Sequence, residues 1–272
     1  LIAFAMATPG LASRYLTPLL GPPLSFAAWR EGAGAAPGQL GIDRLEAAIA
    51  HLNGPPQRLY GVVGADVAAS LSPALHGAAA RGLALPYLMV PLSVPDPAEL
   101  GELFAPAGAT CFDRVGLAAH GWAVTTPYKE AAAAAATVQA PRVRRAGAAN
   151  TLILKPTQVV AENTDADGVV GSLANINYEP RGRTALVQGT GGAARGAAVG
   201  LHLAGATVLL RGRDPQRTRA TAAALGIGSL APDATAPKAA ILVNATPLGR
   251  EEGEPTPFAD SEVATAAAVV DM

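Results

Sequence analysis

The sequence predicts an α/β protein in which short apolar strands alternate with helices. Three observations support this fold class. Strand-like apolar runs are separated by helical segments along most of the chain, a glycine-rich turn joins one strand to an alanine-rich helix, and half of the 272 residues are hydrophobic. Alternating strands and helices favour parallel sheets with helical crossovers, and a chain of this length can bury one or two cores.

Charge, hydrophobicity and cysteine content indicate which kinds of binding partner to expect. A net charge of −1 gives no reason to expect nucleic acid or an anionic membrane, and no apolar run suits a membrane-spanning helix. The single cysteine, Cys111, excludes an internal disulfide, so a cytoplasmic location is expected. His76 and His120 have no second His or Cys at ligand spacing, so no metal site is expected. The expected partner is a small molecule.

Residues 1–53 form a segment of two strand–helix units, which are too few to close a domain. Apolar runs predict strands at Leu1–Met6 and Leu24–Trp29, and helical periodicity predicts helices at Leu11–Leu20 and Ile42–Leu52. This segment is expected to be separate from the rest of the chain.

A linker rich in glycine and proline, Asn53–Gln57, marks the boundary to a new α/β domain over residues 58–160. Helices are expected to begin at Pro73, Pro97 and Lys129. The predicted strands, which we expect to be parallel, are Leu59–Val63, Tyr87–Pro91, Trp122–Thr125 and Thr151–Leu154.

Residues 161–272 are predicted to form a nucleotide-binding domain. An apolar strand, Ala185–Val187, leads through Gly189, Gly191 and Gly192 into an alanine-rich helix, and a second strand follows at Thr207–Leu210. Glycines let the backbone approach a pyrophosphate, and the free N–H groups of the helix N-terminus face it. The spacing fits the looser form of the Rossmann dinucleotide motif, although a turn without a ligand is the alternative.

The end of the second strand indicates which dinucleotide is bound. Arg211, Arg213 and Arg217 follow one another closely, and guanidinium groups suit the 2′-phosphate of NADP. Asp214 leaves NAD as an alternative, because its carboxylate could turn toward a ribose hydroxyl.

Three polar clusters fall at strand–helix junctions, where open α/β sheets bind ligands. They lie at Ser70–His76, at Val124–Glu130, and at Gly147–Thr151 together with Glu162–Asp165. Oxidation of an alcohol by a nicotinamide needs a group that takes the hydroxyl proton. Lys129 and Asp165 are the candidates for this role, with Ser70, Ser72, Thr125 and Asn150 holding a small polyhydroxylated acid. Helix caps, a solvated lysine and turn formers are the alternatives.

Six ordered motifs, SLSPALH, VTTPYKE, GAANTL, ENTDADG, GTGGAARG and VNATPLG, resemble those of the shikimate dehydrogenases over residues 59–272. The resemblance implies NADP-linked interconversion of 3-dehydroshikimate and shikimate in chorismate and aromatic amino acid biosynthesis, with Lys129 and Asp165 as the catalytic pair. It also implies a substrate site of Ser70, Ser72, Thr125, Asn150 and Asp165. The implied cofactor residues are Gly189, Gly191, Gly192, Ala193, Arg213, Arg217, Asn244 and Thr246.

The first segment resembles the C-terminal end of the type I 3-dehydroquinate dehydratase barrel, through the motifs FAM, SRYL, PLSFAAW and AAPGQL within residues 1–52. This implies that residues 1–53 are a remnant of a (β/α)8 barrel. The family's Schiff-base lysine and catalytic histidine lie on earlier strands, so no dehydratase activity is expected of this chain. The order of the two resemblances implies a fragment of a bifunctional dehydratase–shikimate dehydrogenase.

The sequence departs from the shikimate dehydrogenase pattern at Ala123 and Gly212, where the family commonly has polar residues. The family also continues beyond Asp271 and Met272 with a helix that packs back on its first domain, so we expect weak or missing activity from the chain as given. Two alternatives stay open: an NAD-linked quinate/shikimate dehydrogenase, and a non-catalytic nucleotide-binding regulator of the same fold.

Overall fold

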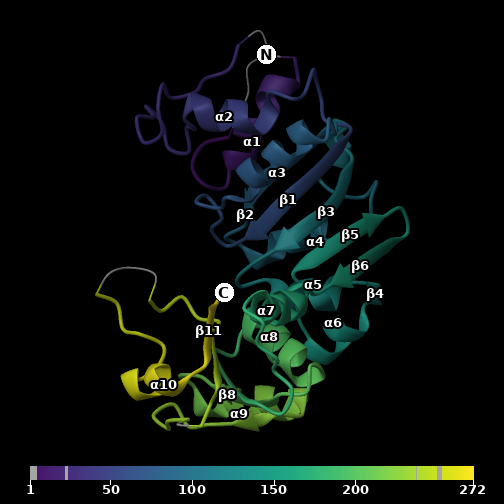
Figure 1. The fold of residues 1–272 in the computed structure, drawn as a ribbon. Coiled ribbons are helices and arrows are strands. Elements are labelled where there is room, and N and C mark those ends of the chain that lie inside the picture. Colours follow the sequence, from purple (N-terminus) through teal and green to yellow (C-terminus); the bar gives the residue numbers. More distant parts are fainter. Residues whose placement is uncertain (1–4, 22–23, 237, 250–252) are drawn as a thin grey trace. The chain divides into compact units, whose positions relative to one another are not determined.

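The structure is a computed structural model that describes residues 5–21, 24–236, 238–249 and 253–272. Its contacts divide the chain into two compact units, each with a sheet of its own (Figure 1). The first unit consists of Leu1–Tyr128, Ala135–Val138 and Thr151–Val160. The second unit consists of Lys129–Ala134, Gln139–Asn150 and Ala161–Met272.

The sheet of the first unit has the strand order β2-β1-β3-β5-β6-β4. Strand β1 lies between β2 and β3 and pairs in parallel with both, as predicted. The strands are rich in buried aliphatic residues, and Trp122 on β3 is buried with its indole N–H donating to the carbonyl of Leu103 at 2.6 Å. The strand bounds are Arg58–Gly64 (β1), Tyr87–Ser93 (β2), Ala119–Val124 (β3), Val138–Gln139 (β4), Thr151–Lys155 (β5) and Gln158–Glu162 (β6).

The prediction of a parallel strand at Thr151–Leu154 is wrong in direction, because β5 pairs antiparallel to β3 with Trp122 opposite Leu152. The helices between them, α5 (Lys129–Ala135) and α6 (Pro141–Ala146), belong mainly to the second unit. They therefore do not form a crossover that returns the chain to the same end of the sheet, as a parallel pair requires.

In the first segment, helices α1 (Leu11–Leu16) and α2 (Ile42–Ile49) begin where they were predicted and end four and three residues earlier. The predicted strand Leu24–Trp29 is wrong: within it only Ala28 forms an isolated bridge, with Gly41. Phe26 and Trp29 are 51% and 70% exposed. No strand among the described residues lies alongside this run, and backbone groups without a neighbouring strand do not form a ladder. The predicted strand Leu1–Met6 lies outside the described residues at positions 1–4.

The second unit contains a fully parallel sheet of order β11-β10-β7-β8-β9. The predicted strand–turn–helix–strand is confirmed as β7 (Thr184–Gln188), α8 (Gly192–Leu203) and β8 (Thr207–Arg211). The remaining elements are α7 (Asp165–Asn175), α9 (Pro215–Leu225), β9 (Gly228–Ser229), β10 (Ile241–Asn244), α10 (Asp260–Thr265) and β11 (Ala268–Asp271).

Small residues on α8 bring α7 close to it. A Cβ atom at Gly200 would lie 2.3 Å from the carbonyl oxygen of Ala166, and one at Gly196 would lie 2.8 Å from the Cβ of Asp165. Alanines of α8 pack on β7 and β8 in the core of the unit. The N-terminus of α7, which carries Asp165, is therefore placed by glycines of the nucleotide-motif helix.

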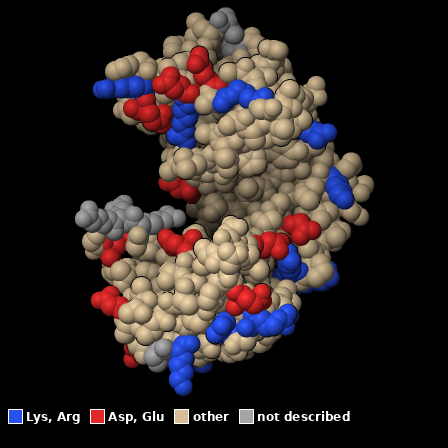
Figure 2. Space-filling view, in the orientation of Figure 1, with Lys and Arg blue, Asp and Glu red and all other residues tan. Residues whose placement is uncertain are grey.

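The surface carries no continuous field of one charge in the view of Figure 2, where acidic and basic side chains are interspersed among uncharged ones. Among the described residues, no helix has both the length and the apolar character needed to cross a membrane.

Candidate active site

Lys129 and Asp165 form an ion pair in the second unit. Lys129 opens α5 and Asp165 opens α7, and Lys129 Nζ lies 2.7 Å from Asp165 Oδ2. Both side chains are only 13% exposed. A helix N-terminus favours an acidic group and disfavours a cation, so the carboxylate at the start of α7 compensates for the lysine at the start of α5.

Asn150 fixes the other oxygen of this carboxylate. Its Nδ2 donates to Asp165 Oδ1 at 3.0 Å and to Thr164 Oγ1 at 2.8 Å, and its Oδ1 accepts from the Thr164 N–H. The structure thus brings together Lys129, Asp165 and Asn150, three of the residues singled out from the sequence.

Asn163 belongs to the third polar cluster but was not assigned a role from the sequence, yet it supports the same carboxylate. Its side chain is buried, donates to the carbonyl of Ala148 at 2.9 Å, and accepts from the Asp165 N–H at 3.1 Å. A buried amide must satisfy its hydrogen bonds, so Asn163 holds the start of α7 in place. A polar residue two positions before the acid was the available signal.

The glycine-rich turn lies directly against the lysine. A Cβ at Gly192 would lie 2.4 Å from the Cβ of Lys129, so only glycine allows this approach. Gly189 has a φ of +121°, and a Cβ there would lie 2.8 Å from the carbonyl oxygen of Ala245. The turn is therefore built around close backbone contacts beside Lys129.

The turn fits a dinucleotide pyrophosphate. Apart from its chain neighbours, no atom of the described residues lies within 4 Å of the position that a Cβ of Gly191 would occupy. Gly191 is the N-cap of the 12-residue helix α8 and makes no side-chain cap, and Ala193 lies in its first turn. The first N–H groups of such a helix have no intrahelical partner and suit an anion.

The three arginines after β8 have different environments. Arg213 is exposed, and Arg217 is 55% exposed with its Nη2 at 3.3 Å from Glu130 Oε1. Asp214 is the N-cap of α9 and accepts from the N–H groups of Gln216 and Arg217. Its carboxylate is therefore engaged by the backbone of its own helix, which weakens the case for Asp214 as a ribose ligand.

Arg211 forms a buried ion pair, so its guanidinium is not available to bind a phosphate. Its Nη1 and Nη2 lie 2.8 and 3.0 Å from the two carboxylate oxygens of Glu262, and both side chains are buried. Glu262 also accepts from the N–H groups of Ala236 and Ala259. The pKa of Glu262 is lowered, because these hydrogen bonds and the guanidinium outweigh the opposing effect of burial.

The glycine at position 212 has a steric cause. A Cβ there would lie 2.7 Å from Thr190 Cγ2 and 2.8 Å from Thr218 Oγ1. Thr190 belongs to the glycine-rich turn, so this turn and the segment that carries Arg213 are in direct contact.

Asn244 and Thr246 lie together after β10. Asn244 Oδ1 accepts from the hydroxyl and the N–H of Thr246, while its Nδ2 donates to Leu248 O and to Asp271 Oδ1. The Asn244 amide stabilises this turn. Its Nδ2 donates both of its hydrogens within the protein.

The first unit holds Ser70, Ser72 and Thr125. The Thr125 methyl and Val67 both pack closely against Gly64, at the end of β1. A Cβ at Gly64 would lie 2.6 Å from Thr125 Cγ2. Ser70 Oγ accepts from the N–H of Ser72 at 3.2 Å. Ser72 is the first residue of α3 (Ser72–Gly82). The structure thus places the serine loop and Thr125 at the same end of β1.

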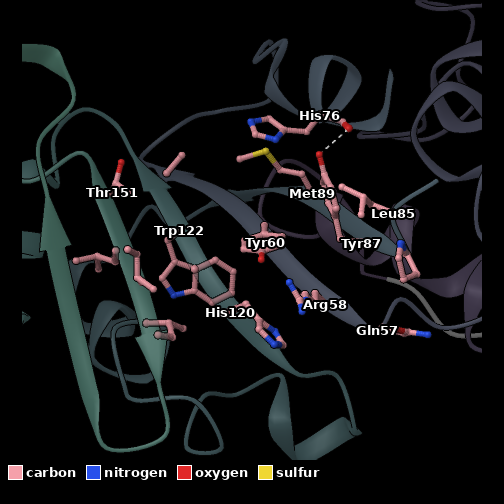
Figure 3. Close-up of a pocket in the computed structure, with 16 residues that line it drawn as sticks. Gln57, Arg58, Tyr60, His76, Leu85, Tyr87, Met89, His120, Trp122 and Thr151 are labelled. Atoms are coloured by element: carbon pink, nitrogen blue, oxygen red, sulfur yellow. Dashed lines mark hydrogen bonds between the residues drawn. The ribbon is translucent and has the colours of Figure 1, made fainter. Parts of the chain in front are cut away.

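A cavity of about 740 Å³ also opens on the first unit (Figure 3). Tyr60, Tyr87, His76 and His120 line it, and Tyr87 Oη donates to the carbonyl of His76. Burial lowers the pKa of His76. None of Ser70, Ser72 and Thr125 is among its lining residues, so it is distinct from the predicted substrate residues. The described residues contain no group of three or more His, Cys, Asp or Glu able to hold a metal.

Two family models match the chain. Residues 62–152 match the shikimate dehydrogenase substrate binding domain, and residues 1–54 match type I 3-dehydroquinase. Both resemblances inferred from the motifs are confirmed, in the same order.

A curated relative from Acidiphilium cryptum, named shikimate dehydrogenase (NADP(+)), is 38% identical over 219 residues, which cover 79% of this chain and 76% of the relative. The chain belongs to the shikimate dehydrogenase family. Another member, from Rubrobacter xylanophilus and with the same name, is 36% identical over 225 residues, covering 78% of this chain and 76% of its own length.

Solved structures of the family have the same α/β fold. The shikimate 5-dehydrogenase of Thermus thermophilus, in complex with NADP(H) and shikimate, aligns with a TM-score of 0.67 at 32% identity and covers 79% of this chain and 78% of its own. The shikimate dehydrogenase of Aquifex aeolicus aligns with a TM-score of 0.68 at 25% identity, covering 79% of this chain and 86% of its own.

Proposed function

We propose that this chain catalyses the NADP-linked interconversion of 3-dehydroshikimate and shikimate. Membership of the shikimate dehydrogenase family supports the reaction class. The observation that carries the proposal is the contact between Gly192 of the nucleotide turn and Lys129, whose ammonium is paired with Asp165. A cofactor-binding turn and a proton-exchanging pair thus lie together in the second unit.

The chemistry assigned to the pair is proton exchange. The nicotinamide, when bound, accepts or supplies the hydride. Lys129 Nζ, in its ammonium form, donates a proton to the carbonyl oxygen of 3-dehydroshikimate during reduction, and in its neutral form accepts the hydroxyl proton of shikimate during oxidation. Asp165 Oδ2 orients Nζ through the 2.7 Å contact, and Asn150 keeps that carboxylate from rotating.

NADP is the proposed cofactor. Arg213 is exposed beside Gly212, which contacts the glycine-rich turn through Thr190. Guanidinium groups bind phosphate oxygens with charge-assisted hydrogen bonds. The engagement of Asp214 as a helix cap supports NADP over NAD.

We assign the remaining predicted residues by resemblance. Residues 58–160 would bind the substrate through Ser70, Ser72, Thr125 and Asn150, together with Asp165. Residues 161–272 would bind the cofactor through Gly189, Gly191, Gly192, Ala193, Arg213, Arg217, Asn244 and Thr246. Residues 1–53 are the dehydroquinase-type segment, for which no dehydratase activity is proposed.

The test compares two substrates and two cofactors. Initial rates are measured with shikimate and with quinate, each with saturating NADP⁺ and then NAD⁺. The proposal expects a rate chiefly with shikimate and NADP⁺. A preference for quinate or NAD⁺ would instead favour an NAD-linked quinate/shikimate dehydrogenase, and nucleotide binding without turnover would favour a regulator.

A further inference from the structure

The dehydroquinase-type segment is built into the first unit of the shikimate dehydrogenase fold. Helix α2 packs along α3 (Figure 1), and a Cβ at Gly77 of α3 would lie 2.8 Å from the carbonyl oxygen of Ala47 and 3.1 Å from the Cα of Ala48. Arg81, in the last turn of α3, donates to the same carbonyl of Ala47. The two helix backbones are therefore in direct contact.

Arg44 extends from α2 to the loop that carries the two serines. Its Nη2 donates to the carbonyl oxygen of Ala68 at 2.7 Å, and its Nη1 lies 3.1 Å from Glu31 Oε1. The other oxygen of Glu31 accepts from the Gly41 N–H at 2.9 Å. Glu31 is thus held by the backbone at the start of α2, and it orients the guanidinium toward the loop.

The loop itself is held by a series of hydrogen bonds. The Val67 N–H donates to Ser93 Oγ, the Ser70 N–H donates to the carbonyl of Val67, and the Ser72 N–H donates to Ser70 Oγ. Ala68 lies inside this chain of contacts. A bond from outside to the Ala68 carbonyl therefore restricts the backbone that sets the direction of Ser70 and Ser72.

Arg44 and Ser70 also face one space. A cavity of about 340 Å³ is lined by Glu31, Gly41 and Arg44 of the first segment and by Ser70 and Leu71 of the loop. The Arg44 side chain is 27% exposed. The arginine thus lies beside the serine loop in a partly enclosed site, where a charge-assisted bond is weakened less by solvent than one on an open surface.

We propose that Arg44 is a positioning residue, through which the dehydroquinase-type segment holds the Ser70–Ser72 loop in its substrate-binding conformation. This inference rests on the proposed function of the two serines. The segment that matches type I 3-dehydroquinase would then take a direct part in shikimate binding.

The test uses the full chain with Arg44→Met, which keeps the alkyl stem and removes both hydrogen bonds. The matched control is Arg114→Met, which removes another ion pair of the same unit, 3.2 Å from Arg114 Nη2 to Glu102 Oε1, without touching the loop. We expect the KM for shikimate to rise about 5- to 20-fold, the effect of one or two lost hydrogen bonds. We expect kcat and the KM for NADP⁺ to stay within about twofold.

Amide hydrogen exchange gives a readout that does not need turnover. The N–H groups of Val67, Ala68, Ser70 and Ser72 should exchange faster in Arg44→Met and at the wild-type rate in Arg114→Met. Arg44→Lys, which keeps a donor for the Ala68 carbonyl, should be intermediate in both measurements. This conservative variant also decides the case if Arg44→Met does not fold.

Unchanged exchange in Arg44→Met, or faster exchange without a higher KM for shikimate, would overturn the positioning role. If the wild-type chain shows no turnover of shikimate, the proposed function fails, and the predicted rise in the KM for shikimate cannot occur. The exchange measurement would then still decide whether Arg44 holds the loop.

Discussion

At the residue scale, the buried amide of Asn163 determines where Asp165 lies. It joins the Ala148 carbonyl to the N–H groups at the start of α7 and lies against Gly196 of α8. Loss of a buried hydrogen-bonding partner leaves the remaining groups unsatisfied, at a cost of about 1–3 kcal/mol. Asn163 is thus important to both stability and the geometry of the ion pair.

We therefore predict that Asn163→Ala lowers the free energy of unfolding by about 1–3 kcal/mol and lowers kcat by about tenfold or more, because the carboxylate loses its fixed position. Urea denaturation and initial rates measure the two effects. Asn175→Ala, at the exposed end of the same helix, is the control and should change neither. Wild-type kcat in Asn163→Ala would show that Asp165 is positioned without it.

The guanidinium of Arg213 should discriminate between the cofactors. Arg213→Ala is expected to weaken NADP⁺ binding by about 10- to 100-fold, the effect of lost hydrogen bonds to a charged group, with little change for NAD⁺. Arg217→Ala should have a smaller effect, because Arg217 is already paired with Glu130. Fluorescence titration with NADPH and NADH measures this, with the exposed Arg219→Ala of the same helix as control. Equal losses for both cofactors would contradict the assignment of Arg213 to the 2′-phosphate.

At the element scale, the Arg211–Glu262 pair ties the end of β8 to the start of α10. The folded protein lowers the pKa of Glu262 below its ordinary value of 4.5. A carboxyl whose pKa is lower in the folded state stabilises the fold above its unfolded pKa, and this contribution is lost as the pH falls through the folded pKa. The pair should therefore make the second unit sensitive to acid.

Glu262→Gln tests this. We expect it to reduce stability near neutral pH by about 3 kcal/mol, because Arg211 stays buried without its anion. We also expect the decline in unfolding free energy as the pH falls below the ordinary pKa of 4.5 to be shallower than in wild type. Asp260→Asn, an exposed acid on the same helix, should keep the wild-type slope. An equally steep decline in Glu262→Gln would mean that other carboxylates cause it.

The elements of the second unit were predictable because local signals agree there. The strand of Ala185–Val187, its glycines and the alanine-rich helix each favour the structure that forms. The run Leu24–Trp29 shows where such signals stop: it is apolar enough for a strand, but pairing depends on a neighbour that periodicity does not specify. The direction of β5 likewise depends on where α5 and α6 pack, which is a tertiary property.

The residues of the candidate site also fall into two groups, those that could be predicted from the sequence and those that could not. Lys129, Asp165 and Asn150 could be singled out because their residue types and motif spacing point to proton exchange, and the structure brings them together. Asn163 and Arg44 act through backbone groups of distant segments, Ala148 and Ala68. Contacts of this kind leave no periodic pattern, so the sequence does not reveal which backbone groups these side chains bind.

At the scale of the whole molecule, one chain joins two family matches, residues 1–54 and residues 62–152. The first does not form a separate compact unit, since Leu1–Tyr128 belong to one unit by their contacts. The dehydroquinase-type segment is thus part of the support for the shikimate dehydrogenase fold. The Lys129–Asp165 ion pair and the glycine-rich turn lie together in the other unit.

The proposed reaction depends above all on Lys129 exchanging the substrate proton beside a bound NADP. The most direct test is the rate of shikimate oxidation by Lys129→Met, measured together with NADPH binding and with Lys155→Met, the lysine at the exposed end of β5, as control. We predict that kcat falls by about 100-fold or more, that NADPH affinity stays within about threefold, and that the control keeps wild-type values. Turnover at the wild-type rate in Lys129→Met, with cofactor bound, would contradict the role assigned to this lysine.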